Sequence, residues 1–290
     1  MAGISLTTTQ PSSHEFPAVS RPPVPYGAWG LRLAAIAYLS VFILVPVIVV
    51  NVQGLRFGLD MFFQSISAPP AVAAIWLTVW TSALMALINT VMGTLTAYVL
   101  VAYRFRGKAL FNTLVDLPFA IPTLVAGVML VLLYGPQTGV GRFFKNQLDI
   151  DILFATPGIM LALLFVGYPF VIRTVQPVLL SLEPNQQEAA FTIGASGWTT
   201  FRRVILPAIL PAITTGALLS FARSLGEFGS VIIVAGNFPM RSQTATVYVY
   251  TQVEGGDMQG ASAVSMVLLL IAFGVTFIMD GYLRRRLRHA

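Results

Sequence analysis

The sequence predicts an all-α integral membrane protein with six transmembrane helices. Of its 290 residues, 56% are hydrophobic and only 10% are charged, whereas a soluble domain carries about 25% charged residues. Six apolar runs are long enough to cross a hydrocarbon core, which takes about 20 residues of helix. Strands of a membrane β-barrel would be about ten residues long with alternating polarity. These runs are longer and uniformly apolar, so a helical bundle is expected.

The chain divides into a polar tail and a membrane domain. Residues 1–30 are rich in Ser, Thr and Pro and lack the basic segment and apolar core of a signal peptide, so we expect a disordered cytoplasmic tail. Residues 31–290 form the transmembrane domain, with a long loop at 183–207. The expected spans lie near 32–52, 72–102, 112–134, 157–180, 208–234 and 261–283.

Basic residues gather on one side of these spans. That side holds Arg21, Arg32, Arg104, Arg106, Lys108, Arg202, Arg203, Arg284, Arg285, Arg286 and Arg288. The other side holds Arg56, Arg142, Lys145 and Arg241, partly offset by Asp60, Asp149, Asp151, Glu254 and Asp257. Because cytoplasmic loops carry the excess of Lys and Arg, both termini and the 183–207 loop are predicted to be cytoplasmic. The same bias accounts for the net charge of +6, so no nucleic-acid partner is expected.

Several kinds of chemistry are excluded by composition. The chain has no cysteine, and its two histidines, His14 and His289, lie near the ends, so neither a metal site nor a catalytic cluster is expected. The phosphate-binding pattern G-x-x-x-x-G-K-[ST] does not occur, so the chain is not expected to be an enzyme or to bind ATP or another cofactor itself.

Prolines interrupt several spans, and each one removes a backbone hydrogen bond and bends its helix. One interpretation is ordinary bundle geometry, and the other is a wall of bent helices around a pathway. Pro118 and Pro122, one turn apart in DLPFAIPTLVAG, favour the pathway. The two halves of the chain show no inverted repeat of the kind that marks many secondary transporters.

The segment QEAAFTIGASGWTTFRRVILP, residues 187–207, contains residues typical of the ends of two short helices. The first would run from Pro184 to a left-handed turn at Gly194, and Ser196 would cap a second that runs to Leu206. Trp198 and Ile205 would pack the unit against the bundle. Two functions remain open on these grounds: a surface for another protein at the small alanines, or a helix anchored among lipid headgroups.

A motif in this loop resembles a known family. Glu188-Ala189-Ala190, three residues, Gly194, nine residues and then Val204-Ile205-Leu206-Pro207 resemble the EAA motif of permease subunits of binding-protein-dependent ABC importers, which have isoleucine where Val204 stands. The resemblance implies a type I ABC importer permease (MetI-like) bundle with a cytoplasmic coupling helix. It also implies that Glu188, Ala189, Ala190 and Gly194 dock into the ATPase subunit.

Two further segments resemble the sulfate, thiosulfate and molybdate branch of these permeases: FARSLGEFGSVIIVAGN (221–237) and YPFVIRTVQPVLLSLEPNQQEAA (168–190). Chain length favours the T-type sulfate/thiosulfate permease, with a molybdate or tungstate permease as the alternative. An ATP-independent secondary transporter or channel is a more distant one. The resemblance implies a bacterial inner (plasma) membrane, two copies of an ATPase that bind ATP and Mg, a W-type permease as heterodimer partner and a periplasmic sulfate-binding protein.

Charged residues inside the spans are candidates for the pathway. Arg223 and Glu227 are four residues apart on one expected helix, and an arginine at mid-membrane costs about 2.5–3.5 kcal/mol on insertion scales. One interpretation is a structural ion pair. The other is that Arg223, together with Arg173, lines the pathway and offsets the charge of a divalent anion. Residues 237–260 are polar and face the outside, and the sequence does not decide between a strand and a helix there.

Overall fold

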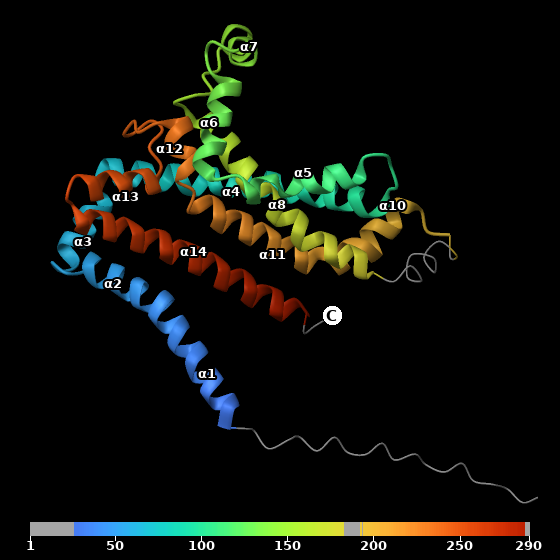
Figure 1. Cartoon of the computed structure of the whole chain (residues 1–290), viewed down its shortest axis with the longest axis horizontal. Coiled ribbons are helices and arrows are strands. Elements are labelled where there is room, and N and C mark those ends of the chain that lie inside the picture. The colour runs from blue at the N-terminus through green and yellow to red at the C-terminus, as the bar shows by residue number, and fades with distance from the viewer. Residues whose placement is uncertain (1–25, 183–191, 193, 288–290) are drawn as a thin grey trace, which may run out of the picture. The chain divides into compact units, whose positions relative to one another are not determined.

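The computed structural model describes residues 26–182, 192 and 194–287, and the described chain is helical with no strand (Figure 1). The predicted all-α class is confirmed. Five of the described helices are long and apolar enough to cross a membrane, and one bent helix pair makes a sixth. The single spans are Trp29–Gly54, Pro69–Ala102, Thr156–Ser181, Gly197–Leu225 and Met258–Met279, and the bent pair joins Lys108–Ala120 to Thr123–Tyr134.

The described chain divides into two units, with the boundary between Ile48 and Val49. The first contains helix α1 (Tyr26–Leu39), the π-helix η1 (Ser40–Leu44) and the start of α2 (Val45–Gly54). Most of the tail predicted to be disordered lies outside the described residues. Its last five residues, 26–30, are helical instead, because the apolar stretch of α1 begins earlier than predicted.

A proline explains the π turn in this first helix. The N–H of Val45 bonds to the carbonyl of Ser40, five residues back, directly before Pro46. A proline ring in a regular α-helix clashes with the carbonyl four residues earlier, and the wider π turn relieves that clash.

The centre of the second unit consists of α4 (Pro69–Ala102), α8 (Thr156–Ser181) and α11 (Leu206–Leu225), which pack side by side (Figure 1). Val171 of α8 lies between two glycines. A Cβ added at Gly93 of α4 would lie 2.9 Å from the Val171 Cβ, and one added at Gly216 of α11 would lie 2.8 Å from the Val171 Cα. Membrane helices associate through close packing at such small residues, so these glycines set the spacing of the bundle.

The third apolar run is not one helix, in contrast to the predicted span at 112–134. Helices α5 (Lys108–Ala120) and α6 (Thr123–Tyr134) meet at 112°. Pro122 causes the break because a residue before proline avoids the helical conformation. Ile121 is accordingly extended, with φ −86° and ψ 124°.

The fifth run is also broken, in contrast to the predicted span at 208–234. Helix α11 ends at Leu225, and a separate short helix, α12 (Gly229–Ala235), follows. Gly226 closes α11, and its N–H bonds to the carbonyl of Ala222.

The second halves of the two broken runs pack against each other, α6 on α12 (Figure 1). A Cβ at Gly127 of α6 would lie 2.9 Å from the carbonyl oxygen of Ser230, so the two backbones are in direct contact. The breaks therefore build one paired structure from two distant parts of the sequence.

The remaining helices are α3 (Leu59–Ser67), α7 (Gly139–Leu148), α13 (Ala245–Glu254) and α14 (Met258–Leu287). Helix α13 resolves the open alternative at residues 237–260 in favour of a helix. Outside the spans, on α7, Lys145 bonds to Asp151 at 2.9 Å and to Asp149 at 3.2 Å. These two carboxylates raise the pKa of the Lys145 ammonium above its ordinary value.

Candidate functional site

The described part of the 183–207 loop begins at its glycine corner. Gly194 has φ +84° and is exposed, and Ser196 Oγ accepts a hydrogen bond from the N–H of Thr199 at 3.2 Å. The predicted left-handed glycine and serine cap are confirmed. Glu188, Ala189 and Ala190 lie outside the described residues, so their docking role stays a prediction.

The second short helix was predicted to end at Leu206, but in the structure it continues past that residue. Helices α10 (Gly197–Thr200), η2 (Phe201–Ile205) and α11 form one continuous helical segment, Gly197–Leu225. The reason is a π turn before Pro207, in which the Leu206 N–H bonds to the Phe201 carbonyl. As a result, the loop is joined to a membrane span without a break.

Packing of this segment differs in part from the prediction. Ile205 is buried, as predicted, and Phe201 packs edge-on against Tyr98 with ring centroids 5.3 Å apart. Trp198 is 69% exposed and, among the described residues, stacks only on Phe201, so the prediction that it packs against the bundle is wrong. A residue three positions later on the same helix, Phe201, takes that role because it faces α4.

A hollow of about 510 Å³ lies beside the glycine corner. It is lined by Gly194, Ala195, Ser196, Thr199, Thr200, Arg203 and Val204. Its walls carry three hydroxyl side chains and one guanidinium. The exposed end of the long helix therefore offers a concave surface with hydroxyl and guanidinium groups in its walls, shortly after the EAA segment in the sequence.

Arg173 lies at the centre of a polar network between α8 and α5. Its Nε and Nη2 donate to the two carboxylate oxygens of Asp116 at 2.6 and 2.7 Å, and Nη2 also donates to the carbonyl of Asn112 at 2.8 Å. Its Nη1 donates to Gln176 Oε1 at 2.6 Å. Gln176 in turn donates to Asn112 Oδ1 at 3.1 Å.

Sequence reasoning missed Asp116, Asn112 and Gln176. A usable signal was present: Asp116 is a single acid within one apolar run, and Arg173 is a single base within another. Charged residues inside a membrane pair with one another, so a lone acid and a lone base in different spans are candidates for a contact.

Arg223 and Glu227 are in contact at the end of α11, with Nη1 2.6 Å from Oε2. The Glu227 side chain is 1% exposed. Its other oxygen, Oε1, accepts from the N–H of Ser230 at 2.9 Å and from Ser230 Oγ at 2.8 Å, which caps α12. The Glu227 carbonyl accepts from Thr246 Oγ1 of α13 at 2.7 Å. Glu227 thus ties three helices together.

The two arginines differ in what their donors do. All three guanidinium nitrogens of Arg173 have partners, whereas within the described chain only Nη1 of Arg223 has one. The Arg223 side chain is 32% exposed. The structure does not join the two arginines into one site: Arg173 bonds to α5, and Arg223 bonds to the link between α11 and α12. No group of three or more His, Cys, Asp or Glu that could hold a metal occurs within the described ranges.

Solved structures with the same fold are transport proteins. The chain matches a bacterial ABC transporter involved in the import of the acidic polysaccharide alginate with a TM-score of 0.75 at 20% identity, covering 90% of this chain and 96% of that one. It matches the MetNI methionine ABC transporter with a TM-score of 0.56 at 19% identity, covering 74% and 94%. The fold is that of the type I ABC importer permease.

The chain belongs to the family of binding-protein-dependent transport system inner membrane components, whose model matches residues 89–289. A member of this family is a multi-pass inner-membrane permease that works with an ATPase and a periplasmic binding protein. ATP is bound by the partner ATPase and not by this chain.

Curated relatives extend over most of the chain. A probable sulfate transport system permease protein cysT of Chlorella vulgaris is 44% identical over 74% of this chain and 80% of the relative. The sulfate transport system permease protein CysT of Synechocystis is 40% identical over 86% of both chains. The CysT protein of Escherichia coli K12 is 36% identical over 88% of this chain and 93% of the relative.

Proposed function

We propose that this chain is a transmembrane subunit of an ATP-driven sulfate and thiosulfate importer in a bacterial inner (plasma) membrane. The observation that carries the proposal is the 36–44% identity to sulfate permeases over most of both chains. The chain pairs with a related W-type permease, and two ATPase copies and a periplasmic sulfate-binding protein complete the assembly. Both termini are cytoplasmic, because the basic residues gather on the side that holds them.

In this proposal the 183–207 loop couples the ATPase to the bundle. Glu188, Ala189, Ala190 and Gly194 dock on the ATPase, with the small alanines allowing close approach. The support is the exposed corner at Gly194, the hollow with hydroxyl and guanidinium groups beside it and the unbroken helix Gly197–Leu225. In this proposal a displacement at the Gly197 end reaches the far end of the span because the helix is continuous.

The far end of this helix leads to α12 and α6, the second halves of the two broken runs. Glu227 caps α12 while its carboxylate holds Arg223 of α11. Helix α12 packs on α6, which follows the break at Pro122. Closure of the ATPases thus moves α11, and the Glu227 link passes this movement to the α12–α6 pair, which opens the pathway toward the outside.

Arg223, rather than Arg173, is the residue that meets the anion. Arg223 is partly exposed and retains donors on Nε and Nη2, whereas the donors of Arg173 are taken up by protein groups. Contact with Glu227 weakens the attraction of Arg223 for a dianion. A pathway site must attract its ion weakly enough to release it, so an arginine held by a carboxylate suits passage better than retention.

The proposal is tested by uptake of radiolabelled sulfate in cells that lack their own sulfate permease and express this chain with its ATPase, second permease and binding protein. Thiosulfate is expected to compete and molybdate is not. If molybdate or tungstate competes more strongly than thiosulfate, the chain is a molybdate or tungstate permease instead. Uptake that persists without the ATPase would instead indicate a secondary transporter or channel.

The coupling role has a separate test in the same cells. Glu188→Lys is expected to abolish uptake while membrane insertion and assembly with the second permease stay normal. Full uptake by Glu188→Lys would exclude the loop as the coupling element and leave the alternative of a lipid-anchored helix.

A further inference from the structure

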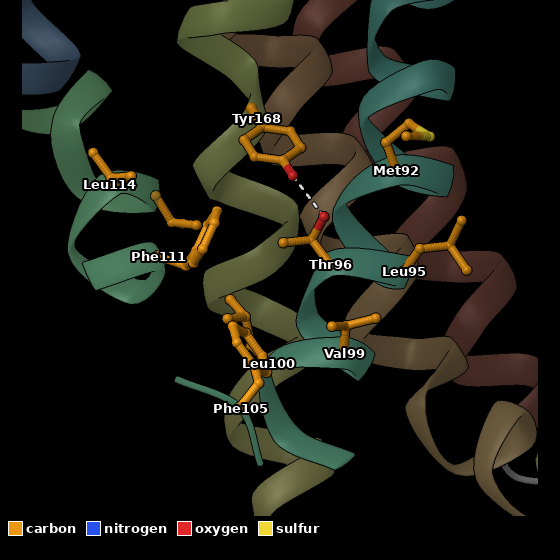
Figure 2. A pocket seen from close by; sticks show the side chains of 10 residues that line it. Met92, Leu95, Thr96, Val99, Leu100, Phe105, Phe111, Leu114 and Tyr168 are labelled. Atoms are coloured by element: carbon orange, nitrogen blue, oxygen red, sulfur yellow. Dashed lines mark hydrogen bonds between the residues drawn. The ribbon is translucent and has the colours of Figure 1, made fainter. Parts of the chain in front are cut away.

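An apolar pocket of about 460 Å³ opens between α4, α5 and α8 (Figure 2). Figure 2 shows Met92, Leu95 and Val99 on one wall and Phe111 and Leu114 on the other, with Tyr168 between them. The walls are half open to the surroundings, since Leu95 is 51% exposed and Leu114 is 43% exposed. Such a volume is in the range of small-molecule sites, about 300–1,000 Å³.

The polar atoms of the pocket satisfy each other. Thr96 Oγ1 and the Tyr168 hydroxyl form a hydrogen bond of 2.6 Å (Figure 2). No charged side chain lines the pocket. Filling such an apolar hollow with hydrocarbon is favourable, whereas water in it would find almost no hydrogen-bond partners.

Cations gather at one end of the pocket. The Phe105 ring lines that end and packs edge-on against Phe111 at 6.0 Å. Arg104 and Arg106 flank Phe105 in the chain, are exposed, and form no ion pair or hydrogen bond within the described residues. Lys108 donates to the carbonyl of Tyr103 at 3.3 Å and has no carboxylate partner within the described residues.

We propose that this pocket binds an anionic phospholipid, with an acyl chain between α4 and α5 and the phosphate at Arg104, Arg106 and Lys108. The ligand must combine a long apolar part with negative charge at one end, because the pocket and the cations adjoin each other. Basic residues beside membrane helices recognise anionic headgroups in this way. The inference rests on the membrane location of the chain and not on its substrate.

The test uses the complete transporter, purified in detergent from membranes that contain phosphatidylglycerol and phosphatidylethanolamine. Native mass spectrometry counts the phospholipid that each complex retains. Arg104→Gln/Arg106→Gln removes the headgroup contact, and Arg142→Gln/Arg241→Gln, two exposed arginines elsewhere, is its charge-matched control. Val99→Trp fills the pocket. Val91→Trp, on the same helix outside the pocket and 53% exposed, is its control.

We expect phosphatidylglycerol to be retained by the wild type and both controls. The affinity for phosphatidylglycerol should fall about thirtyfold in the arginine double variant, because the variant lacks two basic residues that attract an anionic headgroup. Val99→Trp should also release the lipid. Equal retention in all variants, or no preference for phosphatidylglycerol over phosphatidylethanolamine, would overturn the proposal. Loss of the second permease from Val99→Trp with lipid retention unchanged would also overturn it, because the pocket would then be a protein interface.

Discussion

Arg173 and Asp116 form a two-point ion pair that joins α8 to α5. The Arg173 Nε lies 2.6 Å from Asp116 Oδ1, and Nη2 lies 2.7 Å from Oδ2. The remaining nitrogen donates to Gln176. The pair holds α5 on the bundle just before the chain turns by 112° into α6. The pair therefore attaches the first half of the broken third span to α8.

Removing one member of this pair should destabilise the bundle more than removing both. Asp116→Leu leaves a guanidinium without its carboxylate, and we expect a loss of about 2 kcal/mol, typical of a hydrogen bond to a charged group. Asp116→Leu/Arg173→Met replaces the pair by apolar side chains and should recover part of that loss. Thermal unfolding of the detergent-solubilised complex measures both. A double variant no more stable than Asp116→Leu would show that the pair does not act as a unit.

The two arginines should differ in transport. Arg223→Gln is expected to lower sulfate uptake by at least about tenfold at normal expression, a change of about 1.4 kcal/mol in a charge-assisted contact. Asp116→Asn/Arg173→Gln, which removes the other arginine together with its partner, is the matched control and should keep most of the uptake. If the control loses uptake and Arg223→Gln does not, the two assignments are reversed.

Gly194 should tolerate substitution in folding but not in coupling. It has φ +84°, and an added Cβ would meet nothing within 4 Å of the described chain. The folding cost of Gly194→Ala is therefore only that of a left-handed residue, about 1–2 kcal/mol. Asparagine enters this conformation more readily. We expect Gly194→Asn to lower uptake least, Gly194→Ala to lower it more and Gly194→Val to lower it most, with membrane insertion unchanged in all three. Wild-type uptake by Gly194→Val would contradict a docking role for this corner.

Gly167 should be intolerant of even a methyl group. A Cβ there would lie 2.6 Å from both Asn89 Nδ2 and Ser220 Oγ, which join α4 to α11 through a 3.3 Å hydrogen bond. We expect Gly167→Ala to cost about 1–3 kcal/mol, as overpacking of a close interface does. Gly274→Ala, on α14 with nothing within 4 Å of the added Cβ, is the control and should be neutral or stabilising. Equal melting temperatures for the two variants would contradict this packing.

Much of the fold follows from the sequence because long apolar runs leave few alternatives to membrane helices. The breaks were harder to predict. Pro118 lies inside α5, whereas Pro122 follows its end, and the sequence pattern around the two prolines does not say which of them breaks the helix. The end of α11 at Gly226 was also missed, although the Glu227 carboxylate that caps α12 lies only three positions before its partner Ser230.

The candidate site shows the same division between local and long-range information. The left-handed Gly194 and the cap at Ser196 are local and were predicted. The partner of Arg173 is not local, because Asp116 lies 57 positions away on another helix. Its pairing depends on how α5 and α8 pack, which periodicity does not specify.

The most direct test of the account is sulfate uptake into proteoliposomes that contain this chain with its second permease and ATPase, together with the sulfate-binding protein. Uptake should require both ATP and the binding protein, and Glu188→Lys should abolish it while the complex stays intact. Sulfate accumulation without ATP, or equal accumulation by the Glu188→Lys complex, would contradict the central claim that this permease is driven through the 183–207 loop.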